Sequence, residues 1–207
     1  LALSDIGDFD AARQRHLDSA EAERKAGAPA INIICSEVES LRIDIIQGRA
    51  AEALPQIEKR LAQLEGWWQQ HRAGQKVPDA PNREFLDRGI ISTLDIAMEA
   101  DIAAKNWESA LRRTDAILEF KRALERPAAD IAVTRKNRAI LLVNLDRFDE
   151  ARAELEACLQ IFQNDPVGSA RVFGSLAAIL AAQDDIDQAI AQQRRSLALT
   201  EQLPNPS

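Results

Sequence analysis

The sequence has few of the residues that most often build metal sites or disulfide scaffolds. Its two cysteines, Cys35 and Cys158, lie far apart, and neither belongs to a CxxC pair. The two histidines, His16 and His71, are equally isolated. This spacing argues against a disulfide scaffold and against a structural zinc site. We therefore expect the protein to hold no metal and no cofactor.

Positive charge and long apolar runs are also scarce. The chain carries 26 Lys and Arg residues against 33 Asp and Glu residues, a net charge of −7, whereas a nucleic-acid binder needs a basic surface. No apolar run approaches the roughly 18 residues that cross a bilayer; the cluster "AILLV" at 139–143 is an example of their length. We therefore expect neither a nucleic acid nor a membrane as a partner, and a cytoplasmic location.

Catalytic motifs are missing as well. The sequence contains no Gly-rich phosphate loop, no HExxH and no nucleophile elbow, so we expect no enzymatic activity. Asp44 and Asp101 occupy equivalent positions in two repeats, where a buried apolar residue is usual. Two buried carboxylates are candidates for acid–base chemistry. The alternative is a helix register shifted by one residue, which would leave both exposed, and we favour it.

A short motif recurs five times along the chain. It reads "DRFDEARAEL" at 146–155 and is matched by "GDFDAARQRH" at 7–16, "GRAAEALPQI" at 48–57, "KNWESALRRT" at 105–114 and "DDIDQAIAQQ" at 184–193. The alanines that align are Ala12, Ala53, Ala110, Ala151 and Ala189, separated by 41, 57, 41 and 38 residues. A period of this size is typical of stacked helical hairpins.

Residue sizes within the motif suggest how each hairpin closes. A bulky side chain lies three residues before four of the five alanines, as Phe9, Trp107, Phe148 and Ile186. The alanine lets the two helices of a hairpin approach closely, and we expect the bulky residue to fill the gap beside it. Neighbouring hairpins then stack on the same surface, so that no hairpin is stable alone.

Apolar residues recur at three- and four-residue spacing, and alternation typical of strands is absent. The pattern predicts an all-α fold, a right-handed superhelix of about five hairpins in a single domain over residues 1–207. The predicted helices cover 8–27, 30–46, 49–73, 81–103, 106–126, 128–145, 148–164, 167–183 and 186–202, after a truncated first one. The predicted repeats are 1–28, 29–74, 81–126, 128–165 and 167–203.

Two segments carry a family resemblance. "NRAILLVNLDRFDEARAELEACLQIFQNDP" at 137–166 and "FGSLAAILAAQDDIDQAIAQQRRSL" at 173–197 have the small residues, the aromatic or bulky residue and, in the first, the closing proline of tetratricopeptide repeats. The sequence resembles that family, in particular its longer-period variants in bacterial regulatory and scaffold proteins. The chain opens "LALSDIGD", without Met, and we expect it to be part of a larger, bacterial protein.

The resemblance implies that the first helix of each hairpin lines a concave binding face. Counting from the repeat positions places six polar groove residues on that face: Asp95, Glu99, Lys136, Asn137, Arg171 and Ser175, with Ile96, Ile140 and Gly174 beside them. Family members that grip a terminal carboxylate use Lys, Asn and Arg there. Asn137 and Arg171 match this set, whereas Asp95 and Glu99 replace the Lys and Asn of its first repeat, so we expect a basic or mixed-charge partner segment.

An insertion over residues 64–85 explains the longest step between repeats. Leu54, Ile57, Leu61, Leu64 and Trp68 continue one apolar stripe, so the second helix is predicted to extend by two to three turns. Neighbouring residues on a helix lie about 100° apart, so only one of the two tryptophans shares the stripe. We expect Trp68 to be packed and Trp67 to be an exposed anchor for a partner, since Trp is enriched at binding hot spots.

These observations favour a scaffold or adaptor module that binds a protein or peptide partner along its concave face. The alternative is a sensory domain, in which a peptide or small molecule fills the groove and regulates an attached effector. The last predicted helix has no polar capping helix after it. Leu197 and Leu199 are therefore expected to be partly uncovered, which predicts either further repeats or self-association through this helix.

Overall fold

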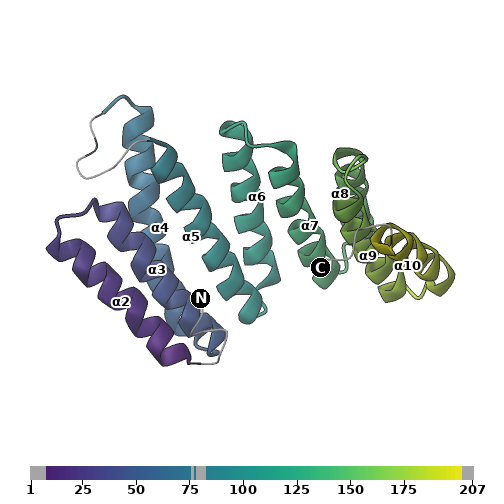
Figure 1. Cartoon of the computed structure of the whole chain (residues 1–207), viewed down its shortest axis with the longest axis horizontal. Helices are drawn as coiled ribbons and strands as arrows, with labels where there is room; N and C mark the ends of the chain where they lie inside the picture. Colours follow the sequence, from purple (N-terminus) through teal and green to yellow (C-terminus); the bar gives the residue numbers. More distant parts are fainter. Residues whose placement is uncertain (1–7, 76, 78–82, 202–207) are drawn as a thin grey trace. The chain divides into compact units, whose positions relative to one another are not determined.

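The structure, a computed structural model, describes residues 8–75, 77 and 83–201, and within them every regular element is an α-helix. In chain order the helices are α2 (Phe9–Lys25), α3 (Ala30–Ile46), α4 (Ala50–Arg72), α5 (Arg83–Ala103), α6 (Trp107–Ala123), α7 (Ala128–Asn144), α8 (Phe148–Ile161), α9 (Pro166–Ala182) and α10 (Ile186–Glu201). Figure 1 shows them as successive antiparallel hairpins. The predicted all-α repeat fold is confirmed.

The predicted helices agree with the observed ones within three residues at each end. The expected partial helix at the start of the chain falls on residues 1–7, outside the described residues. The largest differences are at the ends of α6 and α8, which stop three residues early. At α6 the cause is visible, because Glu125 adopts a left-handed backbone conformation with φ of 50° and terminates the helix.

One type of turn closes every hairpin. Gly48, Lys105, Asp146 and Asp184 all have φ between 57° and 82°, and each lies five residues before an aligned alanine. In each turn the following N–H donates to a carbonyl five residues back, as Arg49 does to Asp44 at 2.8 Å. This is the Schellman motif, which satisfies the last carbonyls of a helix. The recurring motif in the sequence is therefore this turn and the start of the helix that follows.

The aligned alanines are all buried, as the close approach of helices requires. The bulky residues three positions earlier are less buried than we predicted. Phe9, Trp107 and Phe148 are only half-buried, and Ile186 is exposed. The repeat therefore depends on the small residue that brings the helix backbones together, more than on the bulky residue beside it.

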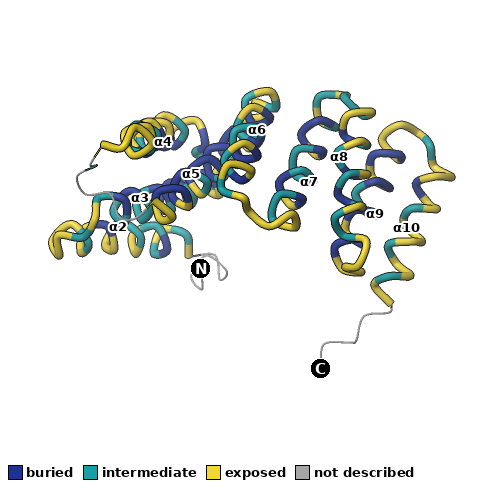
Figure 2. The backbone as a smooth tube through the Cα atoms, turned by 90° about the horizontal axis from the view of Figure 1, so that it is seen from above, coloured by how far each residue is buried: buried dark blue, intermediate teal, exposed yellow. Residues whose placement is uncertain are grey.

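The contacts of the chain separate into two compact units, Leu1–Phe120 and Lys121–Ser207, with the boundary inside α6. In the N-terminal unit α3 is the central helix, since it contacts α2, α4 and α5. It is buried on more than one side, and Val38, Leu41 and Ile45 belong to the hydrophobic core of this unit. Figure 2 shows the buried stretches of α3 and α5 facing their neighbours.

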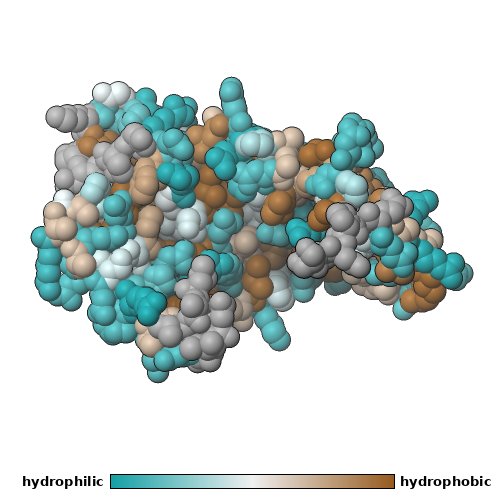
Figure 3. Space-filling view, in the orientation of Figure 1, coloured by the Kyte–Doolittle hydropathy of each residue, from teal (hydrophilic) through white to brown (hydrophobic). Residues whose placement is uncertain are grey.

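In the C-terminal unit α7 packs on α8, α8 on α9 and α9 on α10, and the two first helices α7 and α9 also contact each other. Its buried residues include Ala139, Leu142, Leu155, Val172 and Leu180. The last helix, α10, is mostly exposed (Figure 2), and Ile186, Ile190 and Leu197 form an exposed apolar stripe along it. Figure 3 shows hydrophobic surface at the end of the α9–α10 hairpin.

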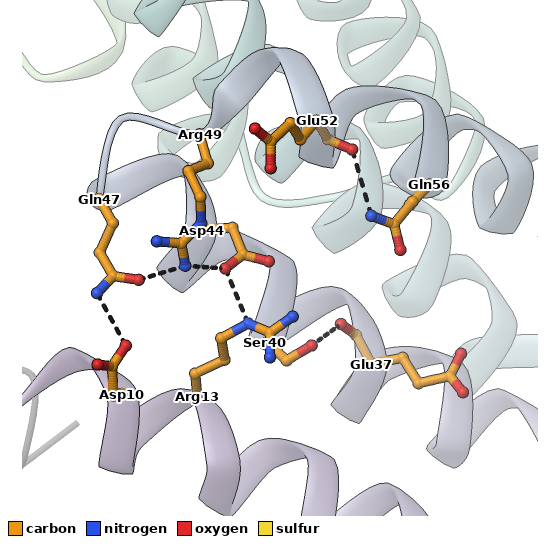
Figure 4. A network of polar contacts seen from close by, with 9 residues as sticks. All are labelled: Asp10, Arg13, Glu37, Ser40, Asp44, Gln47, Arg49, Glu52 and Gln56. Carbon is orange, nitrogen blue, oxygen red and sulfur yellow. Dashed lines mark hydrogen bonds and ion pairs between the residues drawn. The ribbon is translucent and has the colours of Figure 1, made fainter.

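A carboxylate is buried at the end of α3, contrary to our expectation that Asp44 is exposed. The Arg13 guanidinium, on α2, donates from Nε to Asp44 Oδ1 at 2.8 Å, and Arg49 donates to the same oxygen from the turn. Figure 4 shows how Gln47 and Asp10 extend this network. Burial of the charge is tolerated because two arginines pair with it.

The same position is occupied by Asp101 in α5, and it is buried too. Arg113, on α6, donates from Nε to Asp101 Oδ2 at 2.5 Å and also pairs with Glu58 of α4 at 2.7 Å. The equivalent position in the two following hairpins holds Leu142 and Leu180, both buried. The predicted exposure of both carboxylates is therefore wrong. Asp44 joins α3 to α2 of the preceding hairpin, and Asp101 joins α5 to α6 within one hairpin.

Candidate functional site

The predicted site residues fall into both units of the chain. Asp95 and Glu99 lie on α5 and Trp67 on α4, in the N-terminal unit. Lys136 and Asn137 lie on α7, and Arg171 and Ser175 on α9, in the C-terminal unit. The six groove residues therefore form two groups, one in each unit, and each group has its own surroundings.

The acidic group in the N-terminal unit is already paired. Arg42, on α3, donates from Nε to Glu99 Oε2 at 2.8 Å and from Nη2 to Glu99 Oε1 at 2.5 Å. Burial opposes the charge of Arg42, but the hydrogen bonds of Glu99 and the charges of Glu39 and Asp95 raise the pKa of the guanidinium above its usual value. An arginine of the same unit thus holds the position at Glu99 where we expected a partner's cation.

The side chain of Trp67 is not fully exposed to solvent. It is half-buried and packs against the core of the N-terminal unit, so our expectation of an exposed anchor is wrong. Its neighbour Trp68 is packed as predicted, with its Nε1 donating to Asp87 at 2.9 Å and its ring edge against Phe120. Both rings are therefore held by contacts within the N-terminal unit.

Local sequence sets where α7 and α9 begin. Pro127 precedes the first residue of α7, and Asp165 caps α9, with its side chain accepting from the Val167 N–H at 3.0 Å. Pro166 follows at the first position of α9, where its missing N–H costs no hydrogen bond. These starts place Lys136 in the middle of α7 and Arg171 in the second turn of α9.

A hollow of about 570 Å³, which we name the Ile140 hollow, opens between these two helices. Its apolar lining comes from Ala139, Ile140, Val143, Leu155, Gly174, Ala178 and Ile179, and its polar lining from Lys136, Asn144, Arg171 and Ser175. Leu155, on α8, is fully buried and belongs to the core. The hollow is thus an apolar surface with a few polar groups, as is usual for a binding site.

A second hollow, the Val133 hollow, measures about 330 Å³ and lies further toward the starts of α7 and α9. It is lined by Ala129, Asp130, Ala132, Val133, Lys136, Phe162, Asp165, Val167, Gly168, Arg171 and Val172. Lys136 and Arg171 are the two residues that line both hollows. We call the two hollows together the α7–α9 groove.

Large apolar side chains are exposed along this groove. Ile140 is 51% exposed, Val133 50% and Val167 40%. Val133 and Ile140 are seven residues apart on α7, two helical turns, so they share one face of the helix. Exposed isoleucine or valine is unremarkable alone, but three that border one groove make it a candidate interaction surface.

Charges around the groove are unevenly compensated. On α7, Arg135 and Arg138 pair with Glu154 of α8 at 3.5 and 3.1 Å. Asp130 accepts hydrogen bonds from Lys121 and Arg126; although burial opposes its charge, these bonds hold the pKa of the carboxyl below its usual value. Lys136 and Arg171 form no ion pair with any residue in the part of the chain that the structure describes.

The predicted groove positions are partly corrected by this geometry. Ile96 is buried in the core of the N-terminal unit, not in the groove. Asn137 is half-buried and lines neither hollow, whereas Ser175 lines the Ile140 hollow and donates to the Arg171 carbonyl. Sequence reasoning missed Val133 and Val167. Both lie outside the apolar stripe that packs into the core, but the sequence alone does not distinguish such a residue at a groove from one isolated on a surface.

Neither cysteine has the surroundings of a nucleophile. Burial raises the pKa of the Cys158 thiol to about 11, and its Sγ contacts the Ala132 carbonyl at 3.4 Å. Burial and the charges of Glu39 and Glu23 raise the pKa of the Cys35 thiol. A reactive cysteine needs the opposite shift, toward the thiolate. The surroundings of both cysteines therefore favour the protonated thiol, as in buried structural cysteines.

No group of three or more His, Cys, Asp or Glu side chains is arranged to hold a metal ion in residues 8–75, 77 and 83–201. Within the same residues, no helix combines the length and the apolar character that crossing a bilayer requires.

Comparisons with known proteins identify the repeat. Residues 128–202 match the model of the tetratricopeptide repeat family. Comparison with curated protein sequences gave no match.

Among solved structures, a putative kinesin light chain from Podosopora anserina with nearly identical TPR-like repeats is similar at a TM-score of 0.73 and 14% identity, over 99% of this chain and 93% of that chain. BtubC (BKLC) from P. vanneervenii has a TM-score of 0.71 and 14% identity, over 95% of this chain and 75% of that chain. MamA has a TM-score of 0.59 and 13% identity, over 97% of this chain and 93% of that chain. Residues 128–202 therefore belong to the tetratricopeptide repeat family, and the chain has the all-helical repeat fold of its structural relatives.

Proposed function

We propose that the protein is an interaction module within a larger protein, and that the α7–α9 groove holds a segment of a partner protein. Tetratricopeptide repeats generally mediate protein–protein interaction and are typically scaffolds without catalytic activity. The observation that supports the proposal is the exposed apolar surface of Val133, Ile140 and Val167 on the first-helix side of the C-terminal unit. The proposal involves binding only and no catalytic step.

The groove offers the two features that recur in interaction sites. Its floor includes buried core residues such as Leu155, so its shape is set by packing and is present before a partner arrives. Its rim carries Lys136 and Arg171, which add charge selectivity to apolar contact. Asp95 and Glu99 are not included in the proposed site, because Arg42 already compensates Glu99.

The test is a selection of random-sequence peptides displayed on phage against the whole chain, followed by affinity measurements on the enriched peptides. Ile140→Gln removes apolar contact area without adding charge, and we expect it to weaken binding about tenfold. Ile190→Gln is the matched control, because Ile190 is similarly exposed but lies on α10. Peptides that bind both variants equally well would show that the α7–α9 groove is not the site.

A sensory role is the second candidate, and the size of the Ile140 hollow favours it. A volume of about 570 Å³ lies within the range of small-molecule sites. The half-exposed Ile140 argues for a longer ligand instead, since a small molecule gains most from sites that enclose it. A small-molecule panel that raises the melting temperature of the chain, with the rise abolished by Ile140→Gln, would favour the sensory role.

A further inference from the structure

We infer that the α7–α9 groove recognises a partner segment in which one acidic side chain lies between two apolar side chains. This inference rests on the proposed function, because it assigns the chemistry of the segment that the groove would hold. The key observation is that Lys136 and Arg171 line both the Ile140 hollow and the Val133 hollow. The two cations therefore lie where one hollow gives way to the other.

The apolar requirement follows from the linings. Most residues of the Ile140 hollow are apolar, and Val133, Val167, Phe162 and Val172 contribute apolar surface to the other hollow. Each hollow therefore accommodates an apolar side chain of the partner, and filling only one leaves the other exposed to water. Binding is strongest for a segment that fills both, because each buried apolar group adds favourable free energy.

The acidic requirement follows from the charges that remain uncompensated. Lys136 and Arg171 have no ion-pair partner among residues 8–75, 77 and 83–201, although the neighbouring Arg135 and Arg138 both pair with Glu154. A purely apolar segment laid over them would remove water from two cations without replacing its hydrogen bonds, which is costly. A partner carboxylate supplies charge-assisted hydrogen bonds at this point.

Two other carboxylates line the Val133 hollow and do not meet this need. Asp130 is held by Lys121 and Arg126. Asp165 caps the start of α9 through the Val167 N–H. The oxygens that make these bonds, both of Asp130 and Oδ1 of Asp165, are thereby committed to structural roles. The proposed acid of the partner is consequently a local requirement of the groove, on a chain whose net charge of −7 repels acidic molecules in general.

Helix geometry sets the spacing of the recognised side chains. Val133 and Ile140 mark the two hollows and are seven residues apart on α7, which is about 10 Å along the helix. A helical partner segment matches this with apolar residues at i and i+7 and an acid at i+3 or i+4, all on one face. A partner in the polyproline II conformation covers the same length in about three residues.

The experiment uses the peptide selection described above and reads a second property from it. We expect the enriched peptides to share one Asp or Glu between two large apolar residues. The double variant Lys136→Glu, Arg171→Glu should bind these peptides with an affinity lower by about tenfold or more. When the double variant is itself used for selection, it should enrich peptides with Lys or Arg at the position of the acid.

The control is Lys59→Glu, Arg194→Glu, which changes the net charge equally at two exposed positions outside the groove. Circular dichroism of both double variants verifies that they fold. Peptides that depend on Ile140 but carry no acid, or bind the Lys136 and Arg171 variant unchanged, would overturn this inference and leave the proposed function standing. Peptides that do not depend on Ile140 would overturn the proposed function itself.

Discussion

Arg113 and Asp101 provide the sharpest test of how the two helices of the α5–α6 hairpin are held together. Arg113 is 13% exposed and Asp101 1% exposed, and they meet at 2.5 Å. Replacing Arg113 by Met keeps the length of the apolar stem but removes the charge, so Asp101 is left buried without its cation. The positions equivalent to Asp101 in the next two hairpins hold Leu142 and Leu180, so the fold itself does not require a charge at Asp101.

The expected cost of Arg113→Met is about 3–5 kcal/mol of unfolding free energy at pH 7, because removing one partner of a buried pair leaves the other charge buried and uncompensated. The remaining contact, from Asn106 Nδ2 at 3.5 Å, is too long to compensate.

Removing the second partner should restore stability. We expect Arg113→Met, Asp101→Asn to be about 2 kcal/mol more stable than Arg113→Met alone, since the isosteric amide carries no charge. Urea unfolding followed by circular dichroism measures each variant, with Arg112→Met as an exposed control on the same helix that changes stability by less than about 0.5 kcal/mol. A double variant that is less stable than the single one would refute the reasoning, because the two losses would then simply add.

Four further predictions follow from particular residues. Gly168→Ala should cost about 1–2 kcal/mol of unfolding free energy, because a Cβ there would lie 2.5 Å from the Phe162 ring. Gly174→Ala should instead stabilise α9 by roughly 0.5–1 kcal/mol, because the nearest atom to its Cβ, Ser196 Oγ, would lie 3.7 Å away. Thermal melts that reverse this order would contradict the packing at the start of α9. Lys105→Gly should stabilise the chain by about 0.5–1 kcal/mol at the α5–α6 turn, since φ of 59° suits glycine, whereas Gly48→Ala, at the equivalent position of the α3–α4 turn with φ of 82°, should destabilise the chain by a similar amount. Urea midpoints that move the other way would show that these turns are not left-handed. Cys158 should resist alkylation until the C-terminal unit unfolds. Because burial raises the pKa of its thiol to about 11, the contribution of Cys158 to stability should be complete below about pH 9 and decline as pH rises toward 11. The difference in unfolding free energy between the native chain and Cys158→Ala measures this decline, and a difference that stays constant with pH would contradict it. The exposed stripe of Ile186, Ile190 and Leu197 should cause concentration-dependent association that Ile190→Glu, Leu197→Glu reduces; light scattering that finds a monomer at every concentration would show that α10 does not pair with a second copy.

Sequence alone was sufficient for the helices and their order. The period of the aligned alanines and the three- and four-residue spacing of apolar positions predicted nine helices within three residues at their ends. These are local properties, since helical periodicity and turn chemistry involve residues close in the chain. A left-handed residue lies five positions before each of Ala53, Ala110, Ala151 and Ala189, which explains why the turn leaves a recurring motif in the sequence.

The candidate site was only partly predictable. Lys136, Arg171 and Ser175 were predicted from helix counting, and all three line the Ile140 hollow, because counting along a helix gives the face directly. Val133 and Val167 were missed, since an apolar residue outside the core stripe looks the same in sequence whether it borders a groove or lies isolated on a surface. Trp67 was taken for an exposed anchor, although contacts with the core of the N-terminal unit half-bury it.

The sequence by itself determined which segments are helices, where they turn, and which alanines bring them together. Only the tertiary structure decided which charges are compensated. Glu99 is paired because Arg42, 57 residues earlier, lies on a neighbouring helix, and Asp44 and Asp101 are buried because arginines from other helices reach them. Lys136 and Arg171 have no such partner in the described part of the chain. The reason is physical: an ion pair depends on distances between distant segments, which packing of the helices sets and local periodicity does not contain.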